Sequence, residues 1–244
     1  MKAELNTAFI LHRRPYRETS YLLDVFSRDH GRLNLVAKGV RRKGNNKAEL
    51  LQPYQRLQIA WSGKSDLKTL TDVEPDKGGY LLKHGRLLTG FYLNELIVRL
   101  LHQHEAHPDL FDIYDQTLNL LSTGNKNEQL IIRIFEKKLL EATGYGLVLD
   151  HDVDTGRRID AGILYYYQAD RGPSSALPDT EDYKKVSGIA LIELNNEEIT
   201  TGEVMHEAKS LMRYILQKHI GARPLISRKL YQSFLDNSRI DAQQ

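Results

Sequence analysis

The residues whose types and spacing most clearly allow chemistry form one basic run, Lys38-Gly39-Val40-Arg41-Arg42-Lys43-Gly44-Asn45-Asn46-Lys47. It has five positive charges, at Lys38, Arg41, Arg42, Lys43 and Lys47, and no negative charge. A mobile loop of this kind at the mouth of a small barrel can follow a phosphate backbone whatever the base sequence. The alternative is a solvated loop with no partner, and the run alone leaves both open.

A second basic cluster, His12-Arg13-Arg14-Pro15-Tyr16-Arg17, precedes this run. Arg13, Arg14 and Arg17 can contact phosphates while Tyr16 stacks on a base. Alternatively Tyr16 caps a barrel and the arginines are solvated. Tyr54 and Trp61 pose the same choice between barrel rim and stacking platform.

The charge distribution supports a polyanion partner. Between Arg13 and Lys68 there are 13 Lys and Arg residues against 5 Asp and Glu residues, although the whole chain of 244 residues carries a net charge of only +2. The remainder of the chain is therefore net acidic. A basic first third on a nearly neutral protein indicates a polyanion-binding face.

A third candidate site lies on a helix expected from about residue 127 to 143. Ile131, Ile134, Phe135 and Ala142 are expected to face the core, and a second set falls in an arc of about 80° beside them. Two cations between two leucines can receive a peptide with an apolar end and a carboxylate. The alternative is an ordinary helix flank with partly buried side chains. The set consists of Leu130, Arg133, Lys137 and Leu140.

Motifs for catalysis are missing from the sequence. It contains no G-x-x-x-x-G-K-[ST], H-E-x-x-H or G-x-S-x-G pattern. There is no cysteine, which excludes disulfides, catalytic thiols and cysteine zinc sites. Two weak candidates for a metal exist, and we expect neither to bind one: His102, His104 and His107 with Glu105, and His151 with Asp150, Asp152 and Asp154. The sequence thus predicts no enzyme, metal or cofactor.

The location expected for the protein is the cytoplasm. The first residues, Met1 to Thr7, do not have the pattern of a signal peptide. No stretch approaches the roughly 18 apolar residues of a membrane span.

The elements that must position the basic clusters are short strands. Apolar or alternating runs occur at residues 8–12, 21–26, 33–37, 54–61 and 67–73, with turn residues between them. Five strands in about 75 residues fit an OB-type barrel and an SH3-like barrel about equally well. The basic clusters fall between the first and second strands and between the third and fourth.

From about Tyr80 the apolar period becomes helical. A first helix is expected to carry the apolar stripe Leu93, Leu96, Ile97, Leu100 and Leu101. Further helices are expected at about 108–123, 127–143, 187–195, 202–220 and 224–235, with a strand near 163–167 and a loop at 172–175. The fold class is therefore α+β. We expect an N-terminal five-stranded barrel at residues 1–79 and a mainly helical domain at 80–244, with an irregular or β insertion at about 147–182.

Several segments, in order, resemble the RecO family of bacterial recombination mediators. Ala8 to Ser20 is similar to the RecO opening, an apolar strand followed by a proline-containing turn ending in Glu-Thr-Ser. Further RecO-like segments are Asp24-Val25-Phe26-Ser27, Gly31-Arg32, Val36-Ala37-Lys38-Gly39 with Arg41, Leu51-Gln52-Pro53-Tyr54, Leu67-Lys68-Thr69-Leu70, Gly90 to Leu96, Arg133 to Glu136, Leu139-Leu140, Gly144-Tyr145-Gly146 and Pro224 to Arg228.

This resemblance implies an N-terminal OB barrel, a helical C-terminal domain and no enzyme activity. It implies binding of single- and double-stranded DNA, annealing of complementary strands, and action with RecR, in some settings RecF, to replace single-strand binding protein (SSB) with RecA. It also implies that the acidic SSB tail docks on the helical domain, with Arg133 meeting the tail's carboxylate. Some RecO proteins carry a four-cysteine zinc site, which this chain lacks.

Two other readings remain open. An RNA-binding OB-fold accessory protein fits the barrel and the basic loop equally well, although the helical two-thirds and the ordered RecO-like segments count against it. A metal-dependent nuclease would have to use the acidic residues near 150–154.

Overall fold

The structure, a computed structural model, describes residues 4–83, 85–221, 223–231 and 233. The chain divides into two compact units, residues 1–123 with 225–244 and residues 124–224. A boundary near residue 79, expected from the sequence pattern, separates barrel from helices rather than one compact unit from the other. That boundary stays a prediction.

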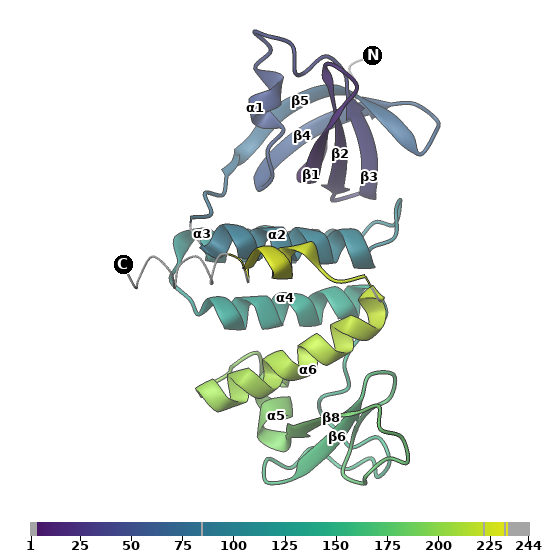
Figure 1. Cartoon of the computed structure of the whole chain (residues 1–244), viewed down its shortest axis with the longest axis vertical. Helices are drawn as coiled ribbons and strands as arrows, with labels where there is room; N and C mark the ends of the chain where they lie inside the picture. Colours follow the sequence, from purple (N-terminus) through teal and green to yellow (C-terminus); the bar gives the residue numbers. More distant parts are fainter. Residues whose placement is uncertain (1–3, 84, 222, 232, 234–244) are drawn as a thin grey trace. The chain divides into compact units, whose positions relative to one another are not determined.

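Five strands of the first unit close into a barrel (Figure 1). They are β1 (Asn6–Tyr16), β2 (Ser20–Ser27), β3 (Gly31–Ala37), β4 (Gln55–Ser62) and β5 (Leu67–Gly79). The order is β1-β2-β3-β5-β4, with β1 pairing β4 and with β3 and β5 parallel. This is the arrangement of an OB fold and decides against the SH3-like alternative. The α+β fold class is confirmed.

A bulge in β1 determines which side chains face the barrel interior. Ile10 pairs with Val25, but His12 pairs with Asp24, so Leu11 is an extra residue. Beyond the bulge, Arg13 lies opposite the buried Leu23, on the interior side of the sheet. Arg14 is therefore on the exterior side and is exposed.

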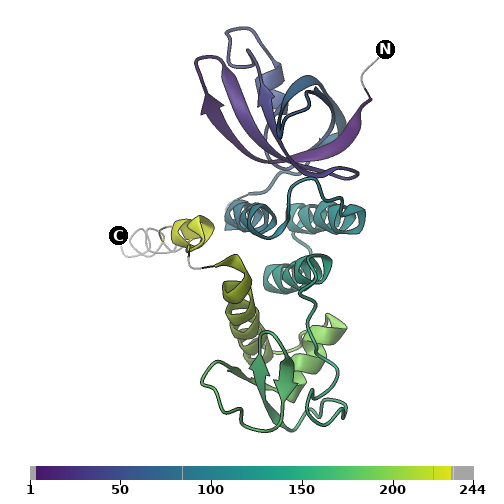
Figure 2. The same cartoon turned by 90° about the vertical axis from the view of Figure 1, so that its right-hand side faces the viewer.

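Helices α2 (Gly85–Leu100) and α3 (Pro108–Thr123) belong to the same unit as the barrel. Figure 2 shows them end-on, side by side beneath the strands. The helical residues 226–231 lie beside α2, because the Glu95 carboxylate accepts hydrogen bonds from the Ile226 N–H at 2.9 Å and the Ser227 N–H at 2.9 Å. A helix from Pro224 to about Leu235 is predicted by the sequence, and residues 232 and 234–235 of it lie outside the described residues.

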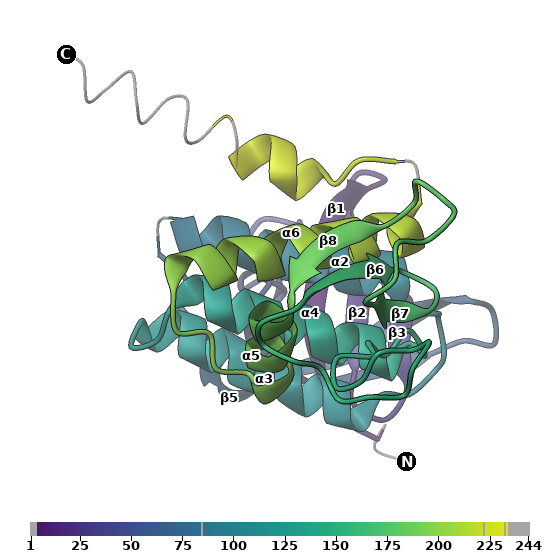
Figure 3. The ribbon, with the colours of Figure 1, turned by 90° about the horizontal axis from the view of Figure 1, so that it is seen from below.

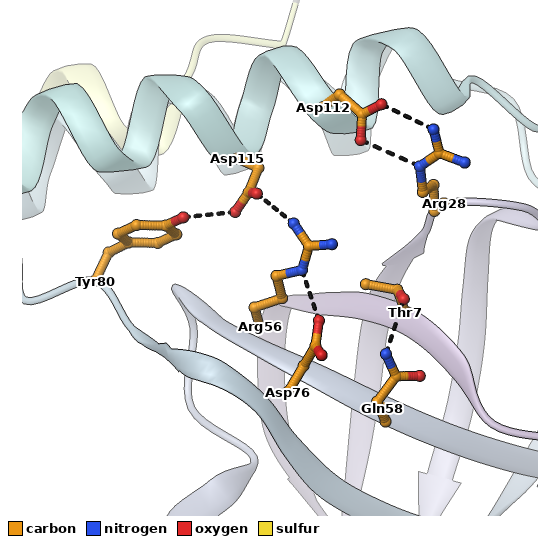
Figure 4. Close-up of polar contacts among 8 residues, drawn as sticks. All are labelled: Thr7, Arg28, Arg56, Gln58, Asp76, Tyr80, Asp112 and Asp115. Carbon is orange, nitrogen blue, oxygen red and sulfur yellow. Dashed lines mark hydrogen bonds and ion pairs between the residues drawn. The ribbon is translucent and has the colours of Figure 1, made fainter.

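A polar seam joins the barrel to α3 (Figure 4). Arg28 and Asp112 form a two-point ion pair. The Arg28 Nε donates to one carboxylate oxygen of Asp112 at 3.1 Å, and an Arg28 terminal nitrogen donates to the other at 2.8 Å. Arg56 contacts Asp76 at 2.7 Å and also Asp115, which accepts a 2.7 Å hydrogen bond from the Tyr80 hydroxyl. Burial and the neighbouring carboxylate raise the pKa of Tyr80 to about 12. None of the residues of this seam belongs to the β1–β2 or the β3–α1 connection.

The second unit contains helices and a small sheet, and α5 and α6 both pack against strand β8 (Figure 3). It contains α4 (Glu128–Ala142), β6 (Leu164–Gln168), β7 (Gly172–Ser174), β8 (Lys184–Ser187), α5 (Gly188–Asn196) and α6 (Gly202–Ile220). The sheet order is β7-β6-β8. The strand expected near 163–167 is confirmed as β6.

One sequence expectation for this unit was wrong. Residues 172–175 were expected to form a loop, but Gly172–Ser174 is strand β7, which pairs with β6. Strand β8 and the four-residue helix α1 (Lys47–Leu50) were not predicted at all. All three elements are too short to show a period in the sequence.

Candidate nucleic-acid interface

The two basic clusters meet at one end of the barrel. The Arg41 N–H donates a 2.9 Å hydrogen bond to the Thr19 carbonyl, and the Arg41 guanidinium lies 3.4 Å from the Arg17 carbonyl oxygen. Tyr21 lies where they join, with the guanidinium of Arg13 5.0 Å and that of Arg41 5.8 Å from its ring centroid. We call the side chains gathered here the basic face: Arg14, Arg17, Lys38, Arg41, Arg42, Lys43 and Lys47.

The basic loop is tied to the barrel by one buried side chain and by hydrogen bonds. Val40 is 3% exposed and belongs to the barrel core. The Gly39 carbonyl accepts hydrogen bonds from the Arg42 N–H and the Asn45 side-chain amide, both at 3.2 Å. These contacts hold the exposed side chains of Arg42 and Lys43 on a preorganised turn.

Counter-charges on the basic face are few. Within the described residues, Lys47 is the one member with a carboxylate partner, Asp72, at 3.3 Å. A hydrogen bond from the Val73 N–H, together with Lys47, holds the pKa of Asp72 below its usual value. The other six cations carry charge that no carboxylate neutralises in the described chain, so the face presents a positive potential.

Arg13, which the sequence predicts to bind DNA, uses its guanidinium for hydrogen bonds within the protein. Its guanidinium donates to the carbonyls of Ala48 at 2.9 Å and Leu51 at 3.3 Å, at the C-terminal end of α1. It also lies over Tyr21. Arg13 therefore joins α1 to the end of the barrel, whereas its neighbour Arg14 has no side-chain partner among the described residues.

The aromatic candidates differ in exposure. Tyr16 is partly exposed, and the Arg17 guanidinium lies 5.3 Å from its ring centroid. Tyr54 is 5% exposed and is not available for stacking. Trp61 is partly exposed and packs one side against the barrel core.

The structure buries two of the four residues predicted to bind a peptide. Arg133 is 7% exposed, and its guanidinium donates to Glu136 at 2.8 Å, with the Lys209 carbonyl at 3.5 Å. Leu140 is fully buried, and Leu130 is partly exposed. Arg133 and Leu140 therefore face the interior although they lie beside the predicted core stripe of α4. The reason is that α4 also packs against α6.

Lys137, the remaining member of this set, holds the end of α5. It donates to the carbonyl of Asn195 at 2.8 Å and pairs with Glu197 at 2.9 Å. These are the last residues of the helix and its cap. Arg133 and Lys137 therefore both make contacts within the second unit: Arg133 with Glu136, and Lys137 with the end of α5.

The acidic cluster near residue 150 organises a turn. Asp152 is 2% exposed, and its carboxylate accepts hydrogen bonds from the N–H groups of Asp154, Thr155 and Ser175. Burial alone would raise the pKa of Asp152, but these hydrogen bonds outweigh burial and lower it well below its usual value. Asp150 contacts His151 at 2.7 Å. Among the described residues, no three such side chains gather in a group that could hold a metal ion.

Two residues that hold the basic face together were not singled out by the sequence reasoning. Tyr21 was taken only as part of a strand, although it lies two residues before Leu23 on the interior side of β2. Val40 was taken as part of the loop. Val40 is an apolar residue within a run of cations, and this is the sequence signal that it could anchor the loop to the barrel core.

Comparison with known proteins gives one consistent family. The model described as "Recombination protein O N terminal" matches residues 1–78, and the model described as "Recombination protein O C terminal" matches residues 84–229. The DNA repair protein RecO of Methylococcus capsulatus is 42% identical over 229 residues, covering 94% of this chain and 93% of the relative. That of Nitrosococcus oceani is 40% identical over 232 residues, covering 95% and 94%. None of the described helices is long and apolar enough to cross a membrane.

Proposed function

Because this chain belongs to the RecO family, we propose that it acts in DNA repair and recombination by binding single- and double-stranded DNA and annealing complementary strands. The observation that carries this proposal is the basic face, where two clusters distant in sequence converge around Tyr21. Six of its seven cations lack a carboxylate partner among the described residues.

The proposed mechanism is electrostatic. Each lysine or arginine that contacts a phosphate releases condensed counterions, which favours binding without reading the base sequence. Neutralising the phosphates of two strands lowers their mutual repulsion, and base pairing then drives annealing. The mechanism breaks no covalent bond and needs neither ATP nor a cofactor, which is why we assign no catalytic residue.

We further propose protein partners from the family resemblance. In this role the protein works in the cytoplasm with RecR, and in some settings RecF, so that RecA replaces SSB on single-stranded DNA. The acidic SSB tail would dock on the helical part of the chain.

Binding of the SSB tail at the predicted site depends on access to Arg133, which is buried and paired with Glu136. For the tail's carboxylate to meet Arg133, it must reach a guanidinium that belongs to a 7% exposed residue and already donates to Glu136 at 2.8 Å. Leu130 is the member of the set that a ligand reaches without rearrangement, since Lys137 and Leu140 are engaged or buried. Binding of a labelled tail peptide, with Leu130→Ala as the non-disruptive variant, tests this site.

The second candidate, an RNA-binding OB protein, is separated by competition. A labelled single-stranded DNA bound to the protein is titrated with unlabelled DNA or RNA of the same sequence. The proposal expects DNA to compete at least as well as RNA. Preferential displacement by RNA would contradict it.

A further inference from the structure

The barrel carries a second cluster of aromatic and basic side chains outside the basic face. It lies at the β4–β5 hairpin and the β2–β3 turn, and Figure 1 shows the hairpin on the right of the barrel and α1 on the left. We infer that this cluster is a base-stacking contact for single-stranded DNA, with Trp61 as the platform and His30, Lys64 and Lys68 around it. The inference rests on the proposed function and adds a second contact to it.

Trp61 has the placement that a stacking platform needs. Its inner side packs against the barrel core, which fixes the ring, and the residue remains partly exposed. The ring of His30, an exposed residue, lies perpendicular to the Trp61 ring with centroids 5.1 Å apart. His30 is itself held by a 3.0 Å contact between its Nε2 and the Asn6 side-chain oxygen. A fixed, partly exposed indole offers a π-face to any base.

Lysines flank this platform. Trp61 pairs with Leu70 on β5, and Lys68 lies two residues before Leu70 on the same side of that strand. The hairpin is tight, since a Cβ at Gly63 would lie 3.7 Å from the Lys68 Cα, and the exposed Lys64 directly follows Gly63 in the connection to β5. Neither lysine has a carboxylate partner among the described residues. Asp66 at the hairpin tip is 94% exposed in its side chain and lies 3.8 Å from His104.

The ligand class follows from this chemistry. OB barrels bind oligonucleotides through the face of strands 2 and 3 and the loops joining strands 1–2 and 4–5. Here Arg17 lies in the first of these loops and Lys64 in the second. A single strand has exposed bases to stack, whereas a duplex keeps its bases paired, so the cluster fits single-stranded DNA.

Trp61 is the one tryptophan of the chain, so it reports its own contacts. The full-length protein is titrated with unlabelled oligothymidylate while tryptophan emission is read, and with a fluorescein-labelled copy while anisotropy is read. We expect emission to fall and saturate with the anisotropy. An abasic oligonucleotide of equal length is expected to raise anisotropy with little change in emission, because it has phosphates but no bases.

A matched pair of lysines adds a second readout. Lys64→Ala is expected to reduce the slope of log affinity against log salt by about 0.7, the value for one phosphate contact on a single strand. Lys77→Ala, an exposed lysine elsewhere on β5, is expected to leave the slope unchanged. Anisotropy that rises without a change in emission, or equal quenching by the abasic strand, would overturn the inference and leave the proposed function standing. If neither signal changes, the proposed function fails and this inference fails with it.

Discussion

The backbone N–H of Arg41 donates a 2.9 Å hydrogen bond to the carbonyl of Thr19, which ties the basic loop to the turn between β1 and β2. Two clusters more than 20 residues apart in sequence thereby present one surface. The Arg17 carbonyl adds a second tie through the Arg41 side chain. The predictions below separate the residues that build this surface from those that use it.

Arg13 and Arg14 should have opposite phenotypes. Arg13→Ala removes the hydrogen bonds to the Ala48 and Leu51 carbonyls, and we expect a loss of about 1–3 kcal/mol in the free energy of unfolding. Arg14→Ala should leave stability unchanged and weaken binding to single-stranded DNA. Urea unfolding and fluorescence anisotropy measure the two quantities. A stable Arg13→Ala variant with the larger DNA defect would reverse this assignment.

The sequence alone could not distinguish these two arginines. Strict alternation from the buried Ala8 and Ile10 would place Arg14 inside and Arg13 outside. The bulge at Leu11 shifts the register by one residue and exchanges their faces. Alternation did predict strand β4, which carries Leu57 and Ile59, because the irregularities in its pairing with β5 place the extra residues on β5.

Long-range packing explains the other difference at the candidate sites. The helical period correctly predicted α4 and its buried Ile131 and Phe135. It could not show that Arg133 and Leu140 are also interior, since that depends on where α6 packs. Convergence of the basic loop on Tyr21 likewise depends on strand pairing that a single sequence does not specify.

Asp72 should weaken DNA binding, because it neutralises Lys47 at 3.3 Å. Asp72→Asn is expected to strengthen binding to single-stranded DNA at low salt and to steepen the salt slope by about 0.7. Anisotropy titrations over a range of salt concentrations measure this. Asp170→Asn, an exposed carboxylate in the second unit, is the control. Weaker binding by Asp72→Asn would mean that Asp72 organises the face.

Arg133 and Glu136 should be energetically coupled. Removing one partner of a buried ion pair costs about 3–5 kcal/mol, because the other charge stays buried. We expect Arg133→Met and Glu136→Leu each to lower the free energy of unfolding strongly, and the double variant to lose much less than their sum. Urea unfolding of the three variants gives the coupling. Additive losses would contradict it.

Asp152 should make the second unit sensitive to acid. Its folded pKa lies below the unfolded value of about 3.9, so its stabilisation is present above that value and is lost as pH falls through the folded pKa. Asp152→Asn is expected to cost about 1–3 kcal/mol at neutral pH and to flatten the fall in stability below about pH 4.

Thermal unfolding at a series of pH values measures both effects of Asp152→Asn. Asp170→Asn, whose side chain is exposed, should keep the acid dependence of the wild type. If Asp152→Asn also keeps that dependence, the carboxylate does not hold the turn against strand β7.

The most direct test of the basic face is the salt dependence of single-stranded DNA binding by a variant that combines Arg14→Ala, Arg42→Ala and Lys43→Ala. The matched control combines Lys77→Ala, Lys126→Ala and Lys229→Ala, which removes the same charge from other exposed positions. The first variant should lose affinity and reduce the slope of log affinity against log salt by about 2, while the control stays close to wild type. Equal slopes for the two variants would contradict the assignment of this face to DNA.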